Sequence, residues 1–318
     1  MSACPKGLIA VPGGKIWYKI AGKNKTRAPL VTLHGGPAAP HDYLEPLEAL
    51  ADERPVVFYD QLGCGLSEKP NDPALWTIER FVEELAGLRR TLKLKRFHLM
   101  GVSWGTMLAV AYLGLKHPKG ILSLTLSGPY LSSSLWHKDQ RRYIEQLPTE
   151  IKNIILNAER DASFAAPEYQ KAMMAYYQRH VCRLQPWPAC LKKAFKKLNM
   201  DIYGRMWGPS EFTIRGTLKN ADCTAMLKDI RTPVLLTCGR YDEASVETTN
   251  YYRSLLPNGR MVIFEDASHM HYLEKKHDYV DLLRAFLQST EEKIPRAGKA
   301  SFFHPPASPQ HKEGPCWP

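Results

Sequence analysis

The sequence predicts an α/β fold with a mostly parallel, doubly wound sheet and an inserted helical cap. Short apolar runs, each followed by glycine or another helix breaker, alternate with longer segments in which apolar residues recur at helical spacing. The apolar runs are nearly continuous, which is typical of parallel strands that are buried on both faces. Between residues 131 and 222 this alternation stops and only helical periodicity remains.

The chain begins with a predicted β-hairpin and two further strands. Leu8–Val11 and Lys15–Ile20 flank the turn sequence Pro12-Gly13-Gly14. The apolar runs Leu30–Leu33 and Val56–Tyr59 follow, and a glycine-containing loop comes after each of them. These two runs are expected to open the parallel part of the sheet.

The next elements continue the alternation of strand and helix. A helix is predicted from about Thr77 to Leu94, because apolar residues recur there at helical spacing and glutamates lie near its start. Phe97–Met100 is predicted to be a strand, Thr106–Leu113 a helix without a breaker, and Ile121–Leu126 another strand.

The rest of the chain is predicted to contain the insertion and the end of the core. Within residues 131–222, which we call the cap, the helical stretches are Ile151–Glu159, Glu168–His180 and Leu191–Leu198. The alternation then resumes with a strand at Pro233–Cys238, a helix at about Val246–Leu256, a strand at Met261–Phe264 and a final helix at about Tyr279–Gln288. We therefore predict an α/β core of residues 1–130 and 223–290, and a proline-rich tail, 291–318, that does not pack.

Composition restricts the class of protein. With 318 residues, 44% hydrophobic and 24% charged, the chain has the composition of a globular enzyme. No apolar run is long enough to span a membrane, and the first residues lack the apolar region of a signal peptide, so we expect a cytoplasmic protein without a membrane partner. The seven cysteines are scattered and include no Cys-x-x-Cys pair, which argues against a disulfide framework and a zinc site.

The formal net charge of +11 makes nucleic-acid binding an alternative to consider. The densest basic clusters, Lys192–Lys197 and Arg89–Arg96, both lie in segments with helical spacing. No nucleic-acid-binding motif accompanies them. We therefore interpret both clusters as solvated helix faces and expect no nucleic-acid partner.

Gly101-Val102-Ser103-Trp104-Gly105 is the segment that carries most of the functional information. A Gly-x-Ser-x-Gly sequence between a predicted strand and a predicted helix is typical of a nucleophile elbow, which exposes a serine on a sharp turn. The turn needs glycines because a side chain at either flanking position would collide with neighbouring backbone. The pattern also occurs without catalysis, but its position here favours Ser103 as a nucleophile.

An activated serine needs a base, and the base needs an orienting acid. Asp242 follows the predicted strand that ends at Cys238, and His269 follows the strand that ends at Phe264. Their order after Ser103 is the one expected for an elbow-type hydrolase. Taken alone, Asp242 could equally cap a turn or a helix, and His271 could be the base in place of His269.

The tetrahedral intermediate of acyl transfer also needs hydrogen-bond donors for its oxyanion. We assign the backbone N–H of Trp104, directly after the nucleophile, as one donor. The second donor is assigned to Gly36, in the His34-Gly35-Gly36-Pro37 loop after an early strand. The alternative for this glycine pair is an ordinary tight turn.

These segments together resemble one known family. In addition to the two motifs above, Asp60-Gln61-Leu62-Gly63-Cys64-Gly65, Gly239-Arg240-Tyr241-Asp242-Glu243 and Ser268-His269-Met270 are similar to the ordered signatures of the proline iminopeptidases. This prolyl aminopeptidase family of α/β-hydrolases includes the archaeal tricorn-interacting aminopeptidase. The resemblance extends from about Leu8 to Leu287 and implies the α/β-hydrolase fold with a helical cap.

The resemblance also implies a role for the cap. Tyr203 and the segment Trp207–Thr213 look like the family's cap sequence, and the two glutamates that hold the substrate's free α-amine correspond to Glu211 and Glu243. A pair of carboxylates supplies the charge and the acceptors that a desolvated ammonium needs. From the residues alone, the favoured interpretation of Glu211 is a solvent-facing helix cap, and that of Glu243 is a residue that supports Asp242.

Two residues depart from the family pattern. Ala38 stands where a glycine is usual after His-Gly-Gly-Pro, and Thr106 replaces the glycine or serine that often follows the elbow. Neither change removes a catalytic group. Either change is expected to narrow or shift the pocket that receives the substrate's first side chain.

The resemblance implies a serine aminopeptidase that releases N-terminal proline, and other residues to an extent the sequence does not fix, from short peptides with a free N-terminus. The implied chemistry proceeds through an acyl-enzyme and needs no metal or organic cofactor. One alternative is an amidase or esterase for amino-acid amides or other small acyl compounds, which would share the triad. Another is a non-catalytic scaffold that binds a ligand or a protein. The sequence does not predict the oligomeric state.

Overall fold

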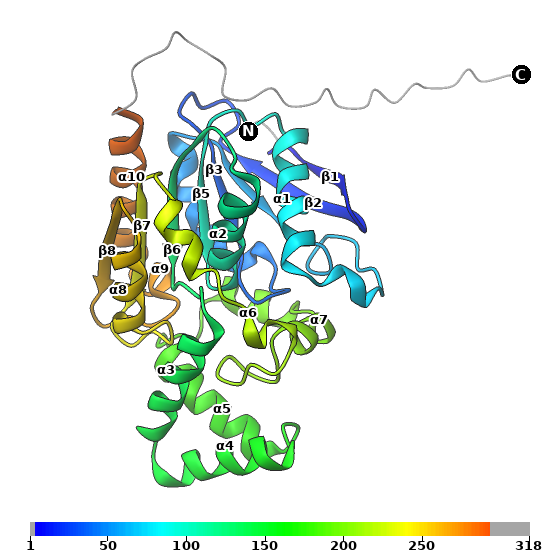
Figure 1. Cartoon of the computed structure of the whole chain (residues 1–318), viewed down its shortest axis with the longest axis vertical. Helices are drawn as coiled ribbons and strands as arrows, with labels where there is room; N and C mark the ends of the chain where they lie inside the picture. The colour runs from blue at the N-terminus through cyan, green and yellow to red at the C-terminus, as the bar shows by residue number, and fades with distance from the viewer. Residues whose placement is uncertain (1–3, 293–318) are drawn as a thin grey trace, which may run out of the picture.

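The computed structural model describes residues 4–292, so most of the predicted tail lies outside the described residues. Its centre is one eight-stranded sheet with the strand order β1-β2-β4-β3-β5-β6-β7-β8 (Figure 1). The strands are β1 (Lys6–Val11), β2 (Gly14–Ala21), β3 (Leu30–Leu33), β4 (Val56–Tyr59), β5 (Phe97–Val102), β6 (Ile121–Ser127), β7 (Val234–Gly239) and β8 (Gly259–Phe264). All pairings are parallel except those of β1 with β2 and of β2 with β4. The predicted hairpin and the mostly parallel sheet are confirmed.

The parallel strands are buried on both faces because alternate side chains enter two different cores. Val57 and Tyr59 of β4 belong to the core that includes helices α1 (Ile78–Thr91) and α2 (Trp104–Lys116). Val56 and Phe58 belong to the core that includes the 3-10 helix η1 (His41–Asp52) and helix α10 (Lys276–Glu292). The layers on the two faces are those of a doubly wound sheet. The sequence did not predict η1.

Five α-helices lie between β6 and β7 and make up most of the helical insertion. They are α3 (Ser133–Glu145), α4 (Thr149–Asp161), α5 (Pro167–His180), α6 (Ala189–Lys196) and α7 (Met200–Met206). Figure 1 shows them gathered at the lower end of the view, beyond one end of the sheet. Predicted helical stretches correspond to α4, α5 and α6. Helix α3 escaped prediction because its sequence is mostly polar and buries few apolar side chains, among them Trp136 and Ile144.

The remaining elements complete the core. They are α8 (Val246–Leu255), α9 (His271–Glu274) and the short 3-10 helices η2 (Pro73–Leu75), η3 (Thr217–Asn220) and η4 (Thr224–Asp229). Within residues 4–292, none of the helices is long and apolar enough to cross a membrane.

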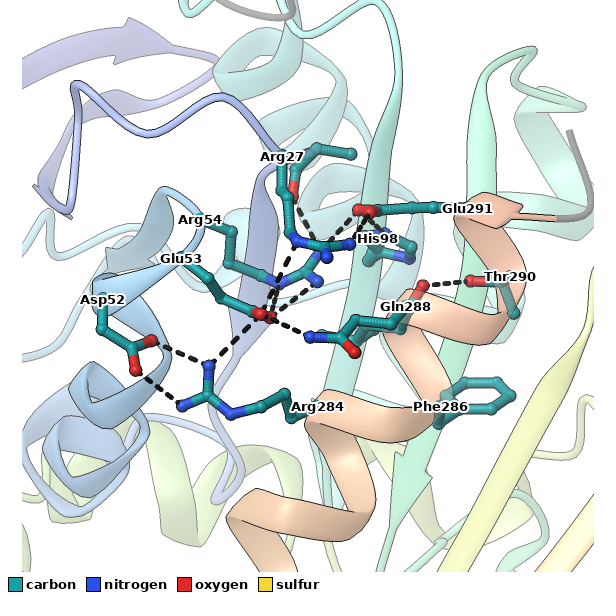
Figure 2. Close-up of polar contacts among 12 residues, drawn as sticks. Arg27, Asp52, Glu53, Arg54, His98, Arg284, Phe286, Gln288, Thr290 and Glu291 are labelled. Carbon is teal, nitrogen blue, oxygen red and sulfur yellow. Dashed lines mark hydrogen bonds and ion pairs between the residues drawn. The ribbon is translucent and has the colours of Figure 1, made fainter. Parts of the chain in front are cut away.

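Helix α10 continues to Glu292, two residues past the predicted boundary of the tail, and Glu291 in its last turn is held by two arginines and a histidine (Figure 2). Its carboxylate accepts hydrogen bonds from Arg54 at 2.7 Å and from Arg27 at 2.9 Å, and lies 3.1 Å from Nε2 of His98. Arg54 is wholly buried and also donates to the carbonyl of Ala28. Arg27, Glu53, Arg54, His98, Arg284 and Glu291 form what we call the basal network. His98 near the start of β5, and Ala28 just before β3, place it at the end of the sheet opposite the insertion.

Candidate active site

Ser103 occupies a strained turn between β5 and α2. Its φ is 54° and its ψ is −125°, a conformation that L-residues rarely adopt. A Cβ on Gly101 would lie 2.2 Å from the carbonyl oxygen of Gly105, and one on Gly105 would lie 2.3 Å from that of Leu33. The structure therefore requires both glycines, as expected for a nucleophile elbow.

His269 and Asp242 meet at the carboxyl ends of β8 and β7. Nδ1 of His269 lies 2.7 Å from Oδ1 of Asp242. The same carboxylate accepts backbone N–H bonds from Ala244 at 2.7 Å and from Gly239 at 3.2 Å. Gly128 adjoins the ring, and a Cβ there would lie 2.6 Å from its Cε1. The imidazole is thus fixed in orientation on both sides.

The charges of this pair stabilise each other. Burial would raise the pKa of Asp242, but the adjacent His269 and His271 lower it to about 2. Burial also acts to lower the pKa of His269, and the Asp242 carboxylate outweighs this effect and raises it. Asp242 is therefore a carboxylate at neutral pH, and it favours the protonated form of His269.

His271, the alternative base, is committed to a different set of partners. It is fully buried, and its Nε2 lies 2.9 Å from the hydroxyls of Ser127 and Thr237. Its Nδ1 lies 3.2 Å from the carbonyl of Ser268 and 3.6 Å from Oδ2 of Asp242. The ring of His271 therefore helps to hold the Asp242 carboxylate in place. His271 is not among the residues that line the pocket at Ser103.

Ser103 and His269 line one pocket together with the predicted glutamates. The wall also contains Gly36 and Tyr203, so six of the eight predicted site residues line this pocket: Gly36, Ser103, Tyr203, Glu211, Glu243 and His269. Asp242 lies behind His269, and Trp104 follows the serine as the first residue of α2. The apolar part of the wall comes largely from the insertion, at Val181, Leu191, Ala194, Phe195 and Leu198.

The loop that contains Gly36 approaches the nucleophile closely. A Cβ on Gly35 would lie 2.8 Å from Cβ of Ser103, and the Gly35 amide donates to the hydroxyl of Tyr43. Gly36 has a φ of +111°, which favours glycine. This geometry brings the backbone of Gly36 to the edge of the pocket beside Ser103.

Glu243 is a buried carboxylate without a partner. The residue is 0% exposed, and neither carboxylate oxygen accepts a hydrogen bond from any residue between 4 and 292. Its Oε1 lies 3.7 Å from Nε2 of His269. Burial, together with the neighbouring Glu211 and Asp242, raises the pKa of Glu243 well above its usual range.

Glu211 lines the same pocket from the insertion. Burial raises its pKa to about 7, although His269 and the side chain of Tyr203 oppose this shift. Its backbone is held at both ends, because its N–H donates to the hydroxyl of Tyr177 at 3.1 Å and its carbonyl accepts from Nε1 of Trp136 at 2.9 Å. Two carboxyl groups therefore face one pocket with little compensating charge.

Helices α3 and α5 position these groups, and sequence reasoning missed this role. Nε2 of Gln140 donates to the carbonyl of Glu243 at 2.9 Å. The amides of His269 and Met270 donate to the carbonyls of His180 and Val181 at 3.0 and 2.9 Å. The available signal was the spacing of Leu135, Trp136, Tyr143 and Ile144, which recur seven or eight residues apart in an otherwise polar stretch.

The two departures from the family pattern have local structural consequences. Ala38 has a φ of 67°, the left-handed region in which glycine carries no penalty, and it is buried. Thr106 donates to the carbonyl of Ser103 at 2.6 Å and accepts from the amide of Tyr130 at 3.0 Å. Thr106 thus fastens the elbow to the loop after β6. Ala39, not Ala38, lines the pocket.

Two clusters of potential metal ligands occur among the described residues, and neither fits a metal. In the first, His34, Asp60 and Cys64, the Asp60 carboxylate already accepts from His41 and Leu66, and Nε2 of His34 accepts from the amide of Gln61. The second cluster consists of His41, Asp42 and Glu45. Its two carboxylates already form ion pairs with lysines of the insertion.

Comparisons with known proteins agree with this geometry. A family model described as the alpha/beta hydrolase fold matches residues 28–276. The proline iminopeptidase of Heyndrickxia coagulans is 44% identical over 285 residues, which cover 89% of this chain and 99% of that protein. The crystal structure of a Mycobacterium smegmatis proline iminopeptidase matches with a TM-score of 0.84 at 30% identity, over 91% of this chain and 99% of that one. The crystal structure of VinJ matches with a TM-score of 0.87 at 33% identity, over 90% and 99% of the two chains. The chain therefore belongs to the proline iminopeptidase family of α/β hydrolases.

Proposed function

We propose that this chain releases an N-terminal proline from short peptides with a free α-amine, with Ser103 as the nucleophile, His269 as the general base and Asp242 as the orienting acid. As a member of the proline iminopeptidase family, the chain is a hydrolase that acts on peptides. The α/β core, residues 1–130 and 223–290, supplies the chemistry in this proposal. The cap, residues 131–222, supplies recognition of the substrate's N-terminus.

The acyl-transfer step uses the geometry of the triad. Ser103 attacks the carbonyl of the first residue while Nε2 of His269 takes its proton and later delivers it to the leaving amine. Asp242 keeps Nδ1 of His269 protonated through the 2.7 Å contact and stabilises the imidazolium. Water then hydrolyses the acyl-enzyme by the same route in reverse.

The oxyanion is held by two backbone amides in this proposal. Trp104 contributes the N–H directly after the nucleophile, at the N-terminus of α2, where the helix dipole also favours negative charge. Gly36 contributes the second N–H from its position beside Ser103 in the pocket wall. The approach of this loop to the serine supports the assignment.

The observation that carries the aminopeptidase assignment is the pair of carboxyl groups beside the nucleophile. Glu243 is wholly buried with both oxygens unpartnered, and Glu211 lies in the same pocket. A buried carboxylate without a partner costs folding free energy, and an arriving ammonium group compensates that cost. A substrate with a blocked N-terminus cannot do so. The assignment of Tyr203 as a substrate-binding residue rests on its place in this wall.

The test is a panel of aminoacyl-arylamides with a free amine and their N-acetylated counterparts. We expect the wild type to prefer the prolyl compound and to reject the acetylated ones. Glu211→Gln and Glu243→Gln together should raise the KM for free-amine substrates while Ser103 stays reactive toward a phosphonate probe. Equal hydrolysis of free and acetylated substrates by the wild type would instead indicate an esterase or amidase.

A further inference from the structure

Helix α6 has two faces with different roles. Leu191, Ala194 and Leu198 recur at helical spacing and line the substrate pocket together with Phe195. Lys193 and Lys197 are four residues apart, which places them on one side of the helix. Helix α6 and the two residues after it, Lys197 and Leu198, therefore carry part of the pocket wall and a pair of half-exposed cations.

Both lysines converge on one carboxylate. Nζ of Lys193 lies 2.6 Å from Oδ1 of Asp42, and Nζ of Lys197 lies 2.9 and 3.1 Å from its two oxygens. The side chain of Asp42 is only 1% exposed, whereas those of the lysines are 49% and 36% exposed. Among residues 4–292 these lysines are the side-chain hydrogen-bond partners of that carboxylate. We call Asp42, Lys193 and Lys197 the latch.

The latch also joins α6 to the loop beside the nucleophile. Asp42 lies in the first turn of η1, a few residues after Gly36 and Ala39, which both line the pocket. The carbonyl of Ala38 accepts a hydrogen bond from the amide of Asn199 at 3.3 Å, just after α6. The side chain of Asn199 donates to the carbonyl of Gly63 at 2.7 Å. A displacement of α6 therefore changes both the pocket wall and the loop that carries Gly36.

The attachment of α6 differs from that of α3 and α5. Those two helices bind the catalytic loops through buried backbone and amide groups, at His269, Met270 and Glu243. Helix α6 packs on the core through the buried side chains of Leu191 and Ala194, but its ion pairs come from half-exposed lysines, which solvent and salt can reach. Of these polar attachments, that of α6 is the most exposed to solvent.

We propose that Asp42 is a specificity-determining positioning residue, which acts through Lys193 and Lys197 to hold α6 at the distance that suits a proline ring. The inference rests on the proposed function, because it concerns the subsite for the substrate's first side chain. With the latch intact, Leu191, Phe195 and Leu198 close on a small ring and disfavour larger side chains. With the latch broken, α6 moves outward and the preference for proline falls.

The chain offers a matched control for the test. Lys192 and Lys196 lie on the same helix and are exposed, and neither forms an ion pair or a side-chain hydrogen bond with a residue in the described part of the chain. The double variants Lys193→Ala/Lys197→Ala and Lys192→Ala/Lys196→Ala therefore remove the same charge from the same helix. Only the first pair removes the contacts to Asp42.

The measured quantity is the ratio of kcat/KM for prolyl-arylamide to that for leucyl- and phenylalanyl-arylamide. We expect this ratio to fall about three- to tenfold in Lys193→Ala/Lys197→Ala and in Asp42→Asn, mainly through a higher KM for the prolyl substrate. Lys193→Arg/Lys197→Arg should restore it, and the control pair should stay within about twofold of the wild type. Raising the salt concentration should lower the wild-type ratio and leave that of Lys193→Ala/Lys197→Ala unchanged.

An unchanged ratio in both Asp42→Asn and Lys193→Ala/Lys197→Ala would overturn the proposal. An equal fall in the control pair would also overturn it, because net charge would then explain the effect. If the proposed function were wrong, the wild type itself would not hydrolyse the prolyl substrate. The latch would then have no role in specificity either.

Discussion

Two groups of buried charges lie at opposite ends of the sheet and are compensated very differently. In the basal network, the Glu291 carboxylate contacts Arg27, Arg54 and His98 (Figure 2). In the pocket, the carboxyl of Glu243 has no hydrogen-bond partner in the described part of the chain, and two neighbouring acids, Glu211 and Asp242, raise its pKa. The pKa values follow: that of Glu291 falls to about 2, whereas that of Glu211 rises to about 7.

The difference shows how to separate structural charge from functional charge. A buried ion whose partners all come from the protein contributes to the folded state, and its loss exposes those partners as unpaired charges. A buried ion whose partner is missing destabilises the protein and persists only where something else supplies the counter-charge. Burial alone does not distinguish the two groups, but the list of partners does. Four predictions test the distinction, and the one with the largest expected effect comes first.

Ser103→Ala should abolish activity without affecting stability. We expect a loss of turnover on the order of 10⁶, because the nucleophile is the one group whose chemistry no neighbour replaces. Ser103 is 7% exposed and loses only a hydroxyl, so the thermal midpoint should remain close to that of the wild type. Hydrolysis at a near wild-type rate would show that the pocket described above is not the active site.

Glu291→Ala should have the opposite effect. It leaves wholly buried Arg54 with Glu53 as its remaining carboxylate partner, and we expect a loss of roughly 3 kcal/mol in the free energy of unfolding. Because the basal network lies at the far end of the sheet, kcat and KM at 25 °C should not change. Urea denaturation measures the first quantity and prolyl-arylamide kinetics the second.

Glu292→Ala is the control for this prediction. Glu292 is exposed and follows Glu291 in the same last turn of α10. Its replacement should change the free energy of unfolding by less than about 0.5 kcal/mol. If the two variants were equally stable, the basal network would be a surface feature and the comparison with the pocket would fail.

The sequence predicts the elements of the core better than the contacts between the two ends of the molecule. The strands at Leu30–Leu33 and Val56–Tyr59 were recognised because both faces are apolar, and the elbow because its glycines are indispensable. The basal network was missed because Glu291 comes from the opposite end of the chain to Arg54. Local pattern carries no information about such a pairing.

The sequence likewise predicts the catalytic residues of the site better than the contacts that hold its two glutamates. Ser103, Asp242 and His269 each follow a strand, so their meeting at one edge of the sheet follows from the order of the elements. The supports of the glutamates do not follow from any local pattern. Tyr177 and Trp136 hold the backbone of Glu211 from two different helices, and the sequence of one of these helices, α3, is mostly polar.

Glu243→Gln should separate stability from activity within the pocket. Because the pKa of Glu243 is raised well above its usual range, folding at neutral pH must either protonate this carboxyl or bury its charge beside Glu211. The amide removes that cost, so the free energy of unfolding should rise by about 1–2 kcal/mol. The KM for free-amine substrates should rise about tenfold or more, because the ammonium loses one of its two carboxylates. Chemical denaturation and steady-state kinetics of the same preparation measure both changes. A variant that is less stable and equally active would assign Glu243 to the structural group.

The dependence of stability on pH should have two limbs that belong to the two regions. Glu291 has a pKa of about 2 in the folded state, below its value of 4.5 in the unfolded chain. Its contribution is therefore complete above pH 4.5 and is lost as the pH falls toward 2. Thermal denaturation from pH 5 to pH 2 should show this acid limb, and Glu291→Ala should make it less steep, with the remainder coming from other carboxylates of lowered pKa such as Asp242.

The pocket limb has the opposite sign. Glu211 has a pKa of about 7 in the folded state, above the unfolded value of 4.5, so the folded protein binds its proton more tightly. The stabilisation is complete below pH 4.5 and is lost as the pH rises through 7. The wild type should therefore become less stable from pH 5 to pH 8, and Glu211→Gln should reduce that slope, to which the raised pKa of Glu243 also contributes. A saturating free-amine inhibitor should also reduce the slope, because its ammonium stabilises the ionised carboxylates that the empty pocket leaves uncompensated. If the inhibitor left the slope unchanged while binding tightly, the amine would bind elsewhere, and the missing partner of Glu243 would need another explanation.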